Sequence, residues 1–276
     1  MLENNIKKRD NINKSFNIII NVFSYFLLIP LILILAYIVK NGISNMNLDF
    51  FISLPKPVGE DGGGASNAII GTFMIVFGAS LLSIPIGVLI GLYLSEHQSK
   101  LSDIVRISIE TLQGIPSIVY GIVAYAWVVL PFGTFSAMSA SVALGLMILP
   151  MVTKATEETL KMIPDTLKEA SYALGGSYLN TMLKVIIPAG FKGILSGILI
   201  GLARITGETA PLLFTAFGNP FMNINPLQPT NALPLMIYNY ATSPYEEWQS
   251  IAWTASLFLI LFVLSLSLMS KMVVKK

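Results

Sequence analysis

The sequence predicts an all-α protein that crosses a membrane six times. Of its 276 residues, 54% are hydrophobic and 12% are charged, and the mean hydropathy is +0.72. Soluble domains carry about 25% charged residues, so this composition argues against a soluble nucleic-acid binder and against a disordered chain. The sequence has no cysteine, which excludes a disulfide scaffold and thiol chemistry.

Six apolar segments are long enough to cross the bilayer, which takes about 20 residues per helix. The first follows a polar tail at residues 1–15 and is too long for a signal-peptide core of about 7–15 residues. Residues 111–153 carry no charge, and Pro131 and Gly133 divide them into two crossings. One six-span domain over residues 16–276 is therefore expected. Its spans are 16–39, 67–94, 110–131, 137–153, 189–217 and 249–270, and its long inner loop is 154–188.

The lysine and arginine residues indicate which side of the membrane each loop occupies. Of the 17 positive residues, Lys40 and Lys56 fall on one side and Arg204 falls inside the fifth span. The others lie on the opposite side: Lys7, Lys8, Arg9, Lys14, Lys100, Arg106, Lys154, Lys161, Lys168, Lys184, Lys192, Lys271, Lys275 and Lys276. Because positive loops stay inside, we expect a multi-pass plasma-membrane protein with both termini in the cytoplasm.

Motifs for catalysis are missing from the sequence. There is no G-x-x-x-x-G-K-[ST] phosphate loop, no G-x-S-x-G and no H-E-x-x-H pattern. The single histidine, His97, follows Glu96 in a short inner turn and is interpreted as a solvated loop residue. We therefore expect no metal and no cofactor on this chain, and we expect that it is not an enzyme by itself.

The inner loop carries helix signals. Pro164 can open a helix, Gly175 and Gly176 end it, and Ser177 can cap the next one. Apolar residues recur at helical spacing at Leu167, Ala170, Ala173 and Leu174. Two short helices joined by a glycine turn are expected. They are suited to close approach by another protein, although an ordinary loop that packs on its own chain is the alternative.

The same loop resembles a known motif. Glu169-Ala170-Ser171, followed by Gly175 and by Val185, Ile187 and Pro188, is similar to the EAA loop of ABC importer permeases. Serine replaces the second alanine of that motif, valine replaces isoleucine and isoleucine replaces leucine. The resemblance implies a coupling helix that docks on an ATPase subunit, with Glu169, Ala170, Ser171 and Gly175 at the contact.

Four further segments narrow the resemblance to phosphate importer permeases of the PstA type, over about residues 62–270. They are GGGASNAIIGTF (62–73), GIPSIVYG (114–121), GETAPLLFTAFGNP (207–220) and LPLMIYNYATSP (233–244). The resemblance implies a type I ABC importer permease that moves phosphate by alternating access.

That resemblance also implies partners. They are a PstC-type permease, two PstB-type ATPase subunits that hold ATP and magnesium, and an extracytoplasmic PstS-type phosphate-binding protein. Membrane lipid surrounds such a chain, and nucleic acid is not a partner. Two alternatives stay open: a permease for another oxyanion, such as molybdate or sulfate, and a stand-alone channel or secondary transporter.

Two charges interrupt the fifth span. A charge inside a span costs about 2.5–3.5 kcal/mol, and Arg204 and Glu208 are spaced to share a helix face. They either neutralise each other or line an anion path, in which arginine binds phosphate oxygens and glutamate prevents overly tight binding. Thr206 and Thr209 would add hydroxyl groups to that path. Lys154 is a second possible anion contact, but a lysine at the membrane interface is the favoured interpretation.

Overall fold

The computed structural model describes residues 2–60 and 62–275, so Lys276 of the positive C-terminus lies outside it. Helices form its framework, and a single parallel bridge between Phe217 and Thr230 is the strand-like pairing of the described part. Within these residues, five helices are long and apolar enough to cross a membrane, or six if one bent pair counts as a span. The predicted all-α, polytopic fold class is confirmed.

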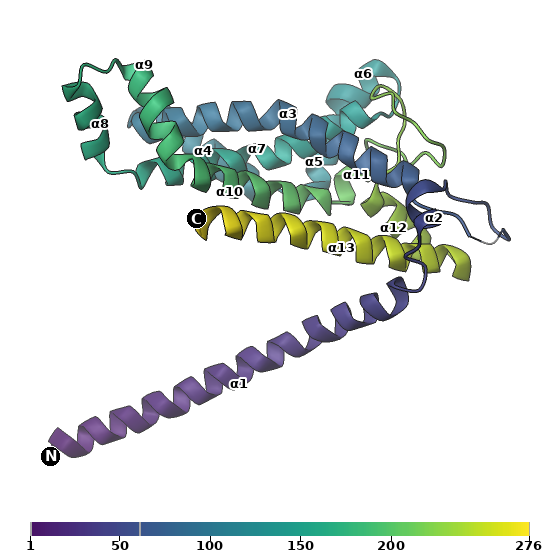
Figure 1. Cartoon of the computed structure of the whole chain (residues 1–276), viewed down its shortest axis with the longest axis horizontal. Helices are drawn as coiled ribbons and strands as arrows, with labels where there is room; N and C mark the ends of the chain where they lie inside the picture. The colour runs from purple at the N-terminus through teal and green to yellow at the C-terminus, as the bar shows by residue number, and fades with distance from the viewer. Residues whose placement is uncertain (1, 61, 276) are drawn as a thin grey trace.

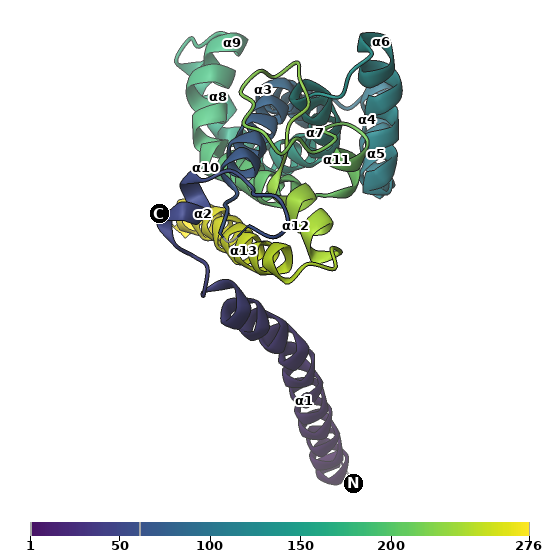
Figure 2. The same ribbon diagram turned by 90° about the vertical axis from the view of Figure 1, so that its right-hand side faces the viewer.

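Helix α1 (Leu2–Gly42) stands away from the rest of the molecule (Figures 1 and 2). It includes most of the expected tail, which continues into the first span without a break. Only its C-terminal end is anchored in the described structure. The rings of Tyr37 and Trp253 pack edge to face with their centroids 5.2 Å apart, and Thr254 donates to the Gly42 carbonyl at 3.0 Å. The apolar flank of α1 therefore needs lipid or another protein to cover it.

The centre of the bundle is the pair α3 (Ser66–Glu96) and α7 (Ala137–Lys161). Small residues allow the two backbones to approach closely: Ser83 donates to the Gly145 carbonyl at 2.6 Å, and a Cβ atom at Gly91 would lie 2.6 Å from the Thr153 carbonyl oxygen. The core around this pair includes Ile75, Leu144, Ile148, Val152, Ile205 and Leu212.

Gly91→Ala is expected to destabilise the protein by about 1–3 kcal/mol, because the added methyl group overlaps α7. The measurement is the thermal unfolding midpoint of the purified protein in detergent. Gly114→Ala is the matched control, since a Cβ atom there has no neighbour within 4 Å. Equal midpoints for the two variants would contradict the close approach of α3 and α7.

The third span is bent. Helix α4 (Lys100–Gly114) and the run formed by α5 (Ser117–Ala124), η1 (Tyr125–Val129) and α6 (Leu130–Phe132) meet at 104°. The span expected at 110–131 therefore covers the end of α4, the bend and the run from α5 to α6. The cause lies at Ile115 and Pro116: proline disfavours helical geometry in the residue before it, and Ile115 is extended with ψ 132°.

The end of the molecule that carries α8 is more helical than expected. Helix α7 runs to Lys161, and α8 (Asp165–Ala173) follows as a separate short helix at the far end of the molecule (Figure 1). The second expected short helix is instead the start of a long one. It comprises α9 (Tyr178–Thr181), η2 (Met182–Ile186) and α10 (Ile187–Thr206), and it ends well before residue 217.

The opposite end of the molecule consists of short helices and loops. They are α2 (Leu48–Ile52), α11 (Ala210–Leu213) and α12 (Leu233–Ala241), followed by the last long helix, α13 (Glu246–Lys275). The Asn67 side chain of α3 donates to the carbonyls of Asn219 and Pro220, at 2.8 and 3.0 Å. These bonds fix the long outer loop over the end of α3.

Candidate functional site

Arg204 lies in the last turn of α10, and its side chain is 51% exposed. Its Nη1 donates to the Met151 sulfur of α7 at 3.7 Å, and its Nε lies 3.9 Å from Glu208 Oε1. Helix α10 ends at Thr206, so Glu208 occupies a turn and not the helix face that the sequence spacing suggested. Because 3.9 Å is long for a hydrogen bond, this ion pair is loose.

The two threonines of the predicted path have different surroundings. Thr206 is buried, and its hydroxyl donates to the Leu202 carbonyl at 2.7 Å, within its own helix. Its side chain therefore contributes to packing in this structure and not to an open surface. Thr209 is half-buried in the turn just before α11. The structure thus brings together Arg204 and Glu208 and turns Thr206 away from exposed surface.

Three other helices contribute polar groups near this point that the sequence analysis did not identify. Gln113, at the end of α4, donates to the Pro150 carbonyl of α7 at 3.2 Å. Tyr120 of α5 is buried, and its hydroxyl donates to the Leu112 carbonyl. The signal available for Gln113 was a polar amide within a long apolar, charge-free stretch. No pattern in the sequence pairs Met151 with Arg204.

Lys154 is exposed at a cavity of ≈ 300 Å³ near the C-terminal end of α7. Beside it, Glu157 accepts from Arg106 Nε at 2.7 Å and from Lys161 Nζ at 2.6 Å. Arg106 also donates to the Leu94 carbonyl at 2.8 Å, so this ion network joins α4 to the C-terminal ends of α3 and α7. The cavity lining is Arg106, Ile109, Glu110, Lys154, Glu157, Glu158 and Lys161.

The predicted coupling residues lie on and just after α8. Glu169 and Ala170 are exposed, whereas Ser171 is half-buried and its hydroxyl lies 2.8 Å from that of Thr181. Gly175 has φ +83°, a left-handed conformation that favours glycine. The serine that departs from the EAA pattern therefore faces its own chain, and the other three residues are accessible to a partner.

An ion pair links α8 to the membrane helices. Lys168 Nζ lies 2.6 Å from Glu96 Oε1, at the end of α3, and 3.5 Å from Asp165 Oδ1. Burial opposes the charged form of Lys168, but the hydrogen bond and charge of Glu96, with a smaller contribution from Asp165, raise its pKa above the usual value. Four large apolar side chains near α8 are exposed in this structure: Met162, Leu174, Leu179 and Leu183.

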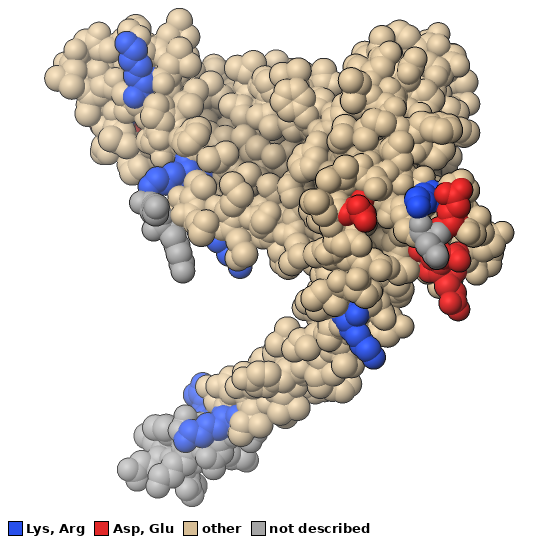
Figure 3. All heavy atoms as spheres, turned by 45° about the vertical axis from the view of Figure 1, so that its right-hand side comes forward, with Lys and Arg blue, Asp and Glu red and all other residues tan. Residues whose placement is uncertain are grey.

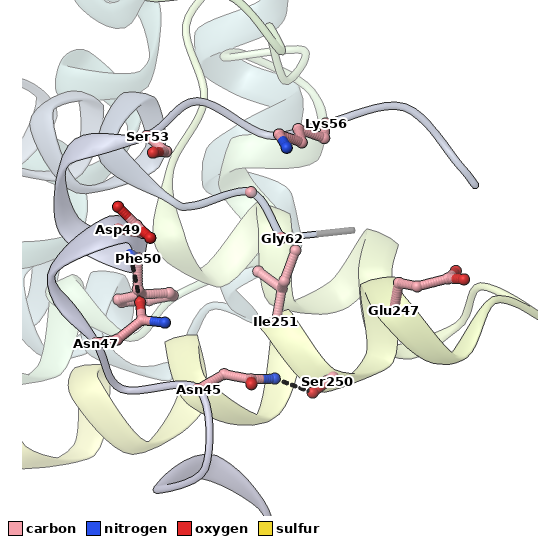
Figure 4. A pocket seen from close by; sticks show the side chains of 11 residues that line it. Asn45, Asn47, Asp49, Phe50, Ser53, Lys56, Gly62, Glu247, Ser250 and Ile251 are labelled. Atoms are coloured by element: carbon pink, nitrogen blue, oxygen red, sulfur yellow. Dashed lines mark hydrogen bonds between the residues drawn. The ribbon is translucent and has the colours of Figure 1, made fainter. Parts of the chain in front are cut away.

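A second cavity, of ≈ 520 Å³, opens at the other end of the molecule, between the α2 segment and the start of α13 (Figure 4). Polar side chains dominate its lining: Asn47 accepts from the Phe50 N–H at 3.0 Å, and Asn45 donates to Ser250. Asp49 and Glu247 also line it. On the face seen in Figure 3, acidic side chains gather at this end, and a broad uncharged region separates them from the basic side chains at the other end.

Residues 83–276 match the family described as binding-protein-dependent transport system inner membrane component. The chain is also 39% identical to the phosphate transport system permease protein PstA of Yersinia pestis over 248 residues, which cover 89% of this chain and 84% of the relative. The chain belongs to this family of transport permeases. The PstA permease of Haemophilus influenzae is 39% identical over 87% of this chain and 85% of the relative. A probable PstA permease of Methanocaldococcus jannaschii is 36% identical over 92% of this chain and 90% of the relative.

The fold agrees with this membership. An inward-facing structure of the MetNI methionine ABC transporter superposes with a TM-score of 0.64 at 21% identity, covering 75% of this chain and 93% of the other. This likeness concerns the fold alone and confirms the predicted type I ABC importer permease architecture. The chain is thus a multi-pass inner-membrane permease of an ABC importer, a transport subunit that works with ATPase and permease partners.

Proposed function

We propose that this permease forms one half of a path through which inorganic phosphate enters the cell. The observation that carries the proposal is the 39% identity to a phosphate permease across 89% of the chain. ATP would be hydrolysed, with magnesium, in two PstB-type subunits, and a PstS-type binding protein would deliver phosphate from outside. A PstC-type permease would supply the other half of the path.

Arg204 supports a path at the surface between the two permeases. It is half-exposed in the last turn of α10, and a charged side chain is unfavourable in lipid. Water or a partner chain must therefore cover it. The loose contact with Glu208 leaves the guanidinium able to bind an anion, and the carboxylate opposes overly tight binding.

Lys154 is better explained as an interface residue. It lies on α7 three residues beyond Met151, about 4.5 Å farther toward the inner end. Three carboxylates, Glu110, Glu157 and Glu158, line the same cavity as Lys154. Arg106 and Lys161 line the cavity too, so three carboxylates balance three cations and the cavity offers an anion no net positive charge. The proposal therefore places the anion contact at Arg204.

Both termini are proposed to be cytoplasmic. In that orientation, α8 and the network around Arg106 and Lys161 lie at the cytoplasmic end, consistent with the positive-inside rule. The polar cavity with Asp49 and Glu247 then lies at the outer end, where an extracytoplasmic protein can reach it.

Phosphate uptake by the reconstituted four-component transporter tests the function. Vesicles loaded with ATP and magnesium are expected to take up labelled phosphate, and unlabelled phosphate should compete far better than molybdate or sulfate. If another oxyanion competes more strongly than phosphate, that oxyanion is the substrate and the proposal is wrong. Equal uptake without ATP would favour a channel or a secondary transporter.

A further inference from the structure

Few hydrogen bonds join the coupling helix α8 to the membrane helices. In the described structure no residue of α8 is buried, and the helix extends beyond the inner end of the bundle (Figure 1). Within the described residues, its side chains form two hydrogen bonds with other elements: Ser171 with Thr181 of α9, and Lys168 with Glu96 of α3. The first joins α8 to the helix that follows it in the chain, and only the second reaches a different span.

The Lys168–Glu96 contact is suited to transmit force. Its two charged atoms are 2.6 Å apart, and the side chains are only 20% and 12% exposed, so water screens the pair weakly. Asp165 is a minor partner, since it lies 3.5 Å from Lys168 and is 84% exposed.

Glu96 is the last residue of α3, which packs along α7 through close backbone contacts. Arg106 fastens the same end of α3, because it binds both the Leu94 carbonyl and Glu157 of α7. A displacement of α8 that reaches Glu96 therefore acts on α3, α4 and α7 together.

We infer that the Lys168–Glu96 ion pair passes the movement of α8 to α3 and so couples ATP hydrolysis to opening of the path. The inference rests on the proposed function and extends it, because these two residues lie outside the surface offered to the ATPase. Lys168 and Glu96 are positioning residues: neither touches the anion or the nucleotide. In this proposal, Glu169 and Ala170 contact the ATPase, whereas Lys168 and Glu96 pass the movement of α8 to α3.

The test compares anion imported per ATP hydrolysed in reconstituted complexes. Glu96→Gln and Lys168→Met are each expected to lower this ratio at least about fivefold, the lower end of typical coupling between sites. Co-purification of the ATPase should stay at the wild-type level, because the docking surface is unchanged. The charge-exchanged variant Glu96→Lys/Lys168→Glu is expected to recover most of the ratio.

Asp165→Asn is the matched control, since it removes the weaker partner of the same lysine and should leave the ratio unchanged. A wild-type ratio in both single variants would overturn the inference. Loss of ATPase binding in parallel with uptake would also overturn it, because the pair would then only hold the docking surface in shape. If the wild-type complex imports another oxyanion, the proposed substrate fails, and the same ratio measured with that anion still tests the pair.

Discussion

Arg204→Gln is expected to reduce phosphate uptake by about 10- to 150-fold while the complex still assembles and hydrolyses ATP. Glutamine keeps polar donors but removes the charge, and a hydrogen bond to a charged group contributes about 1.5–3 kcal/mol. The half-exposed position of Arg204 and its 3.9 Å distance to Glu208 mean that little packing depends on it. The measurement is uptake in reconstituted vesicles, normalised to assembled complex.

The double variant separates the two interpretations of this pair. If Arg204 and Glu208 only neutralise each other, each single variant leaves an uncompensated charge, and Arg204→Gln/Glu208→Gln restores both assembly and uptake. If Arg204 binds the anion, the double variant assembles but does not transport. Near wild-type uptake by the double variant would refute the path role.

Glu208→Gln is expected to lower both KM and the maximal uptake rate. Without the carboxylate, the anion is held more tightly by Arg204 and leaves more slowly. The measurement is uptake rate against phosphate concentration, with ATP saturating. A raised KM would contradict the proposed part of Glu208 in releasing the anion.

The sequence was sufficient to locate four of the long apolar helices because charge is the strongest local signal in a membrane protein. An unpaired charge in lipid is costly, so charge-free runs mark α1, α3, α7 and α13 directly. Pro164 and Gly175 likewise limited α8, because proline fixes its own φ and glycine permits the left-handed conformation that follows the helix.

What the sequence did not predict depends on contacts between distant residues. The bend at Pro116 had a local signal that was outweighed by the length of the apolar run. The end of α10 at Thr206 also had local signals, because Gly207 caps it and Pro211 lies in the next helix, α11. The burial of Thr206 depends on tertiary packing, which periodicity does not reveal. The pairing of Lys168 with Glu96 joins residues 72 apart, so only the folded chain brings them together.

Gly175→Val is expected to weaken association with the ATPase by about 5- to 30-fold while membrane insertion stays intact. At φ +83° a side chain costs about 1–2 kcal/mol, and a branched one is the least tolerated. The turn it would distort holds the end of α8 through two bonds, from Gly175 N–H to the Tyr172 carbonyl and from Gly176 N–H to the Ser171 carbonyl, both at 2.9 Å. The measurements are co-purification of the ATPase and substrate-stimulated ATP hydrolysis.

Gly175→Asn separates backbone strain from crowding. A Cβ atom at this glycine meets nothing within 4 Å in the chain itself, so within this subunit the valine defect is conformational. Asparagine adopts left-handed geometry more readily than other residues and should retain most of the association, despite having a side chain of similar size. If asparagine fails as badly as valine, the docked partner fills the space beside Gly175. If both variants bind and stimulate like the wild type, the turn has no part in coupling.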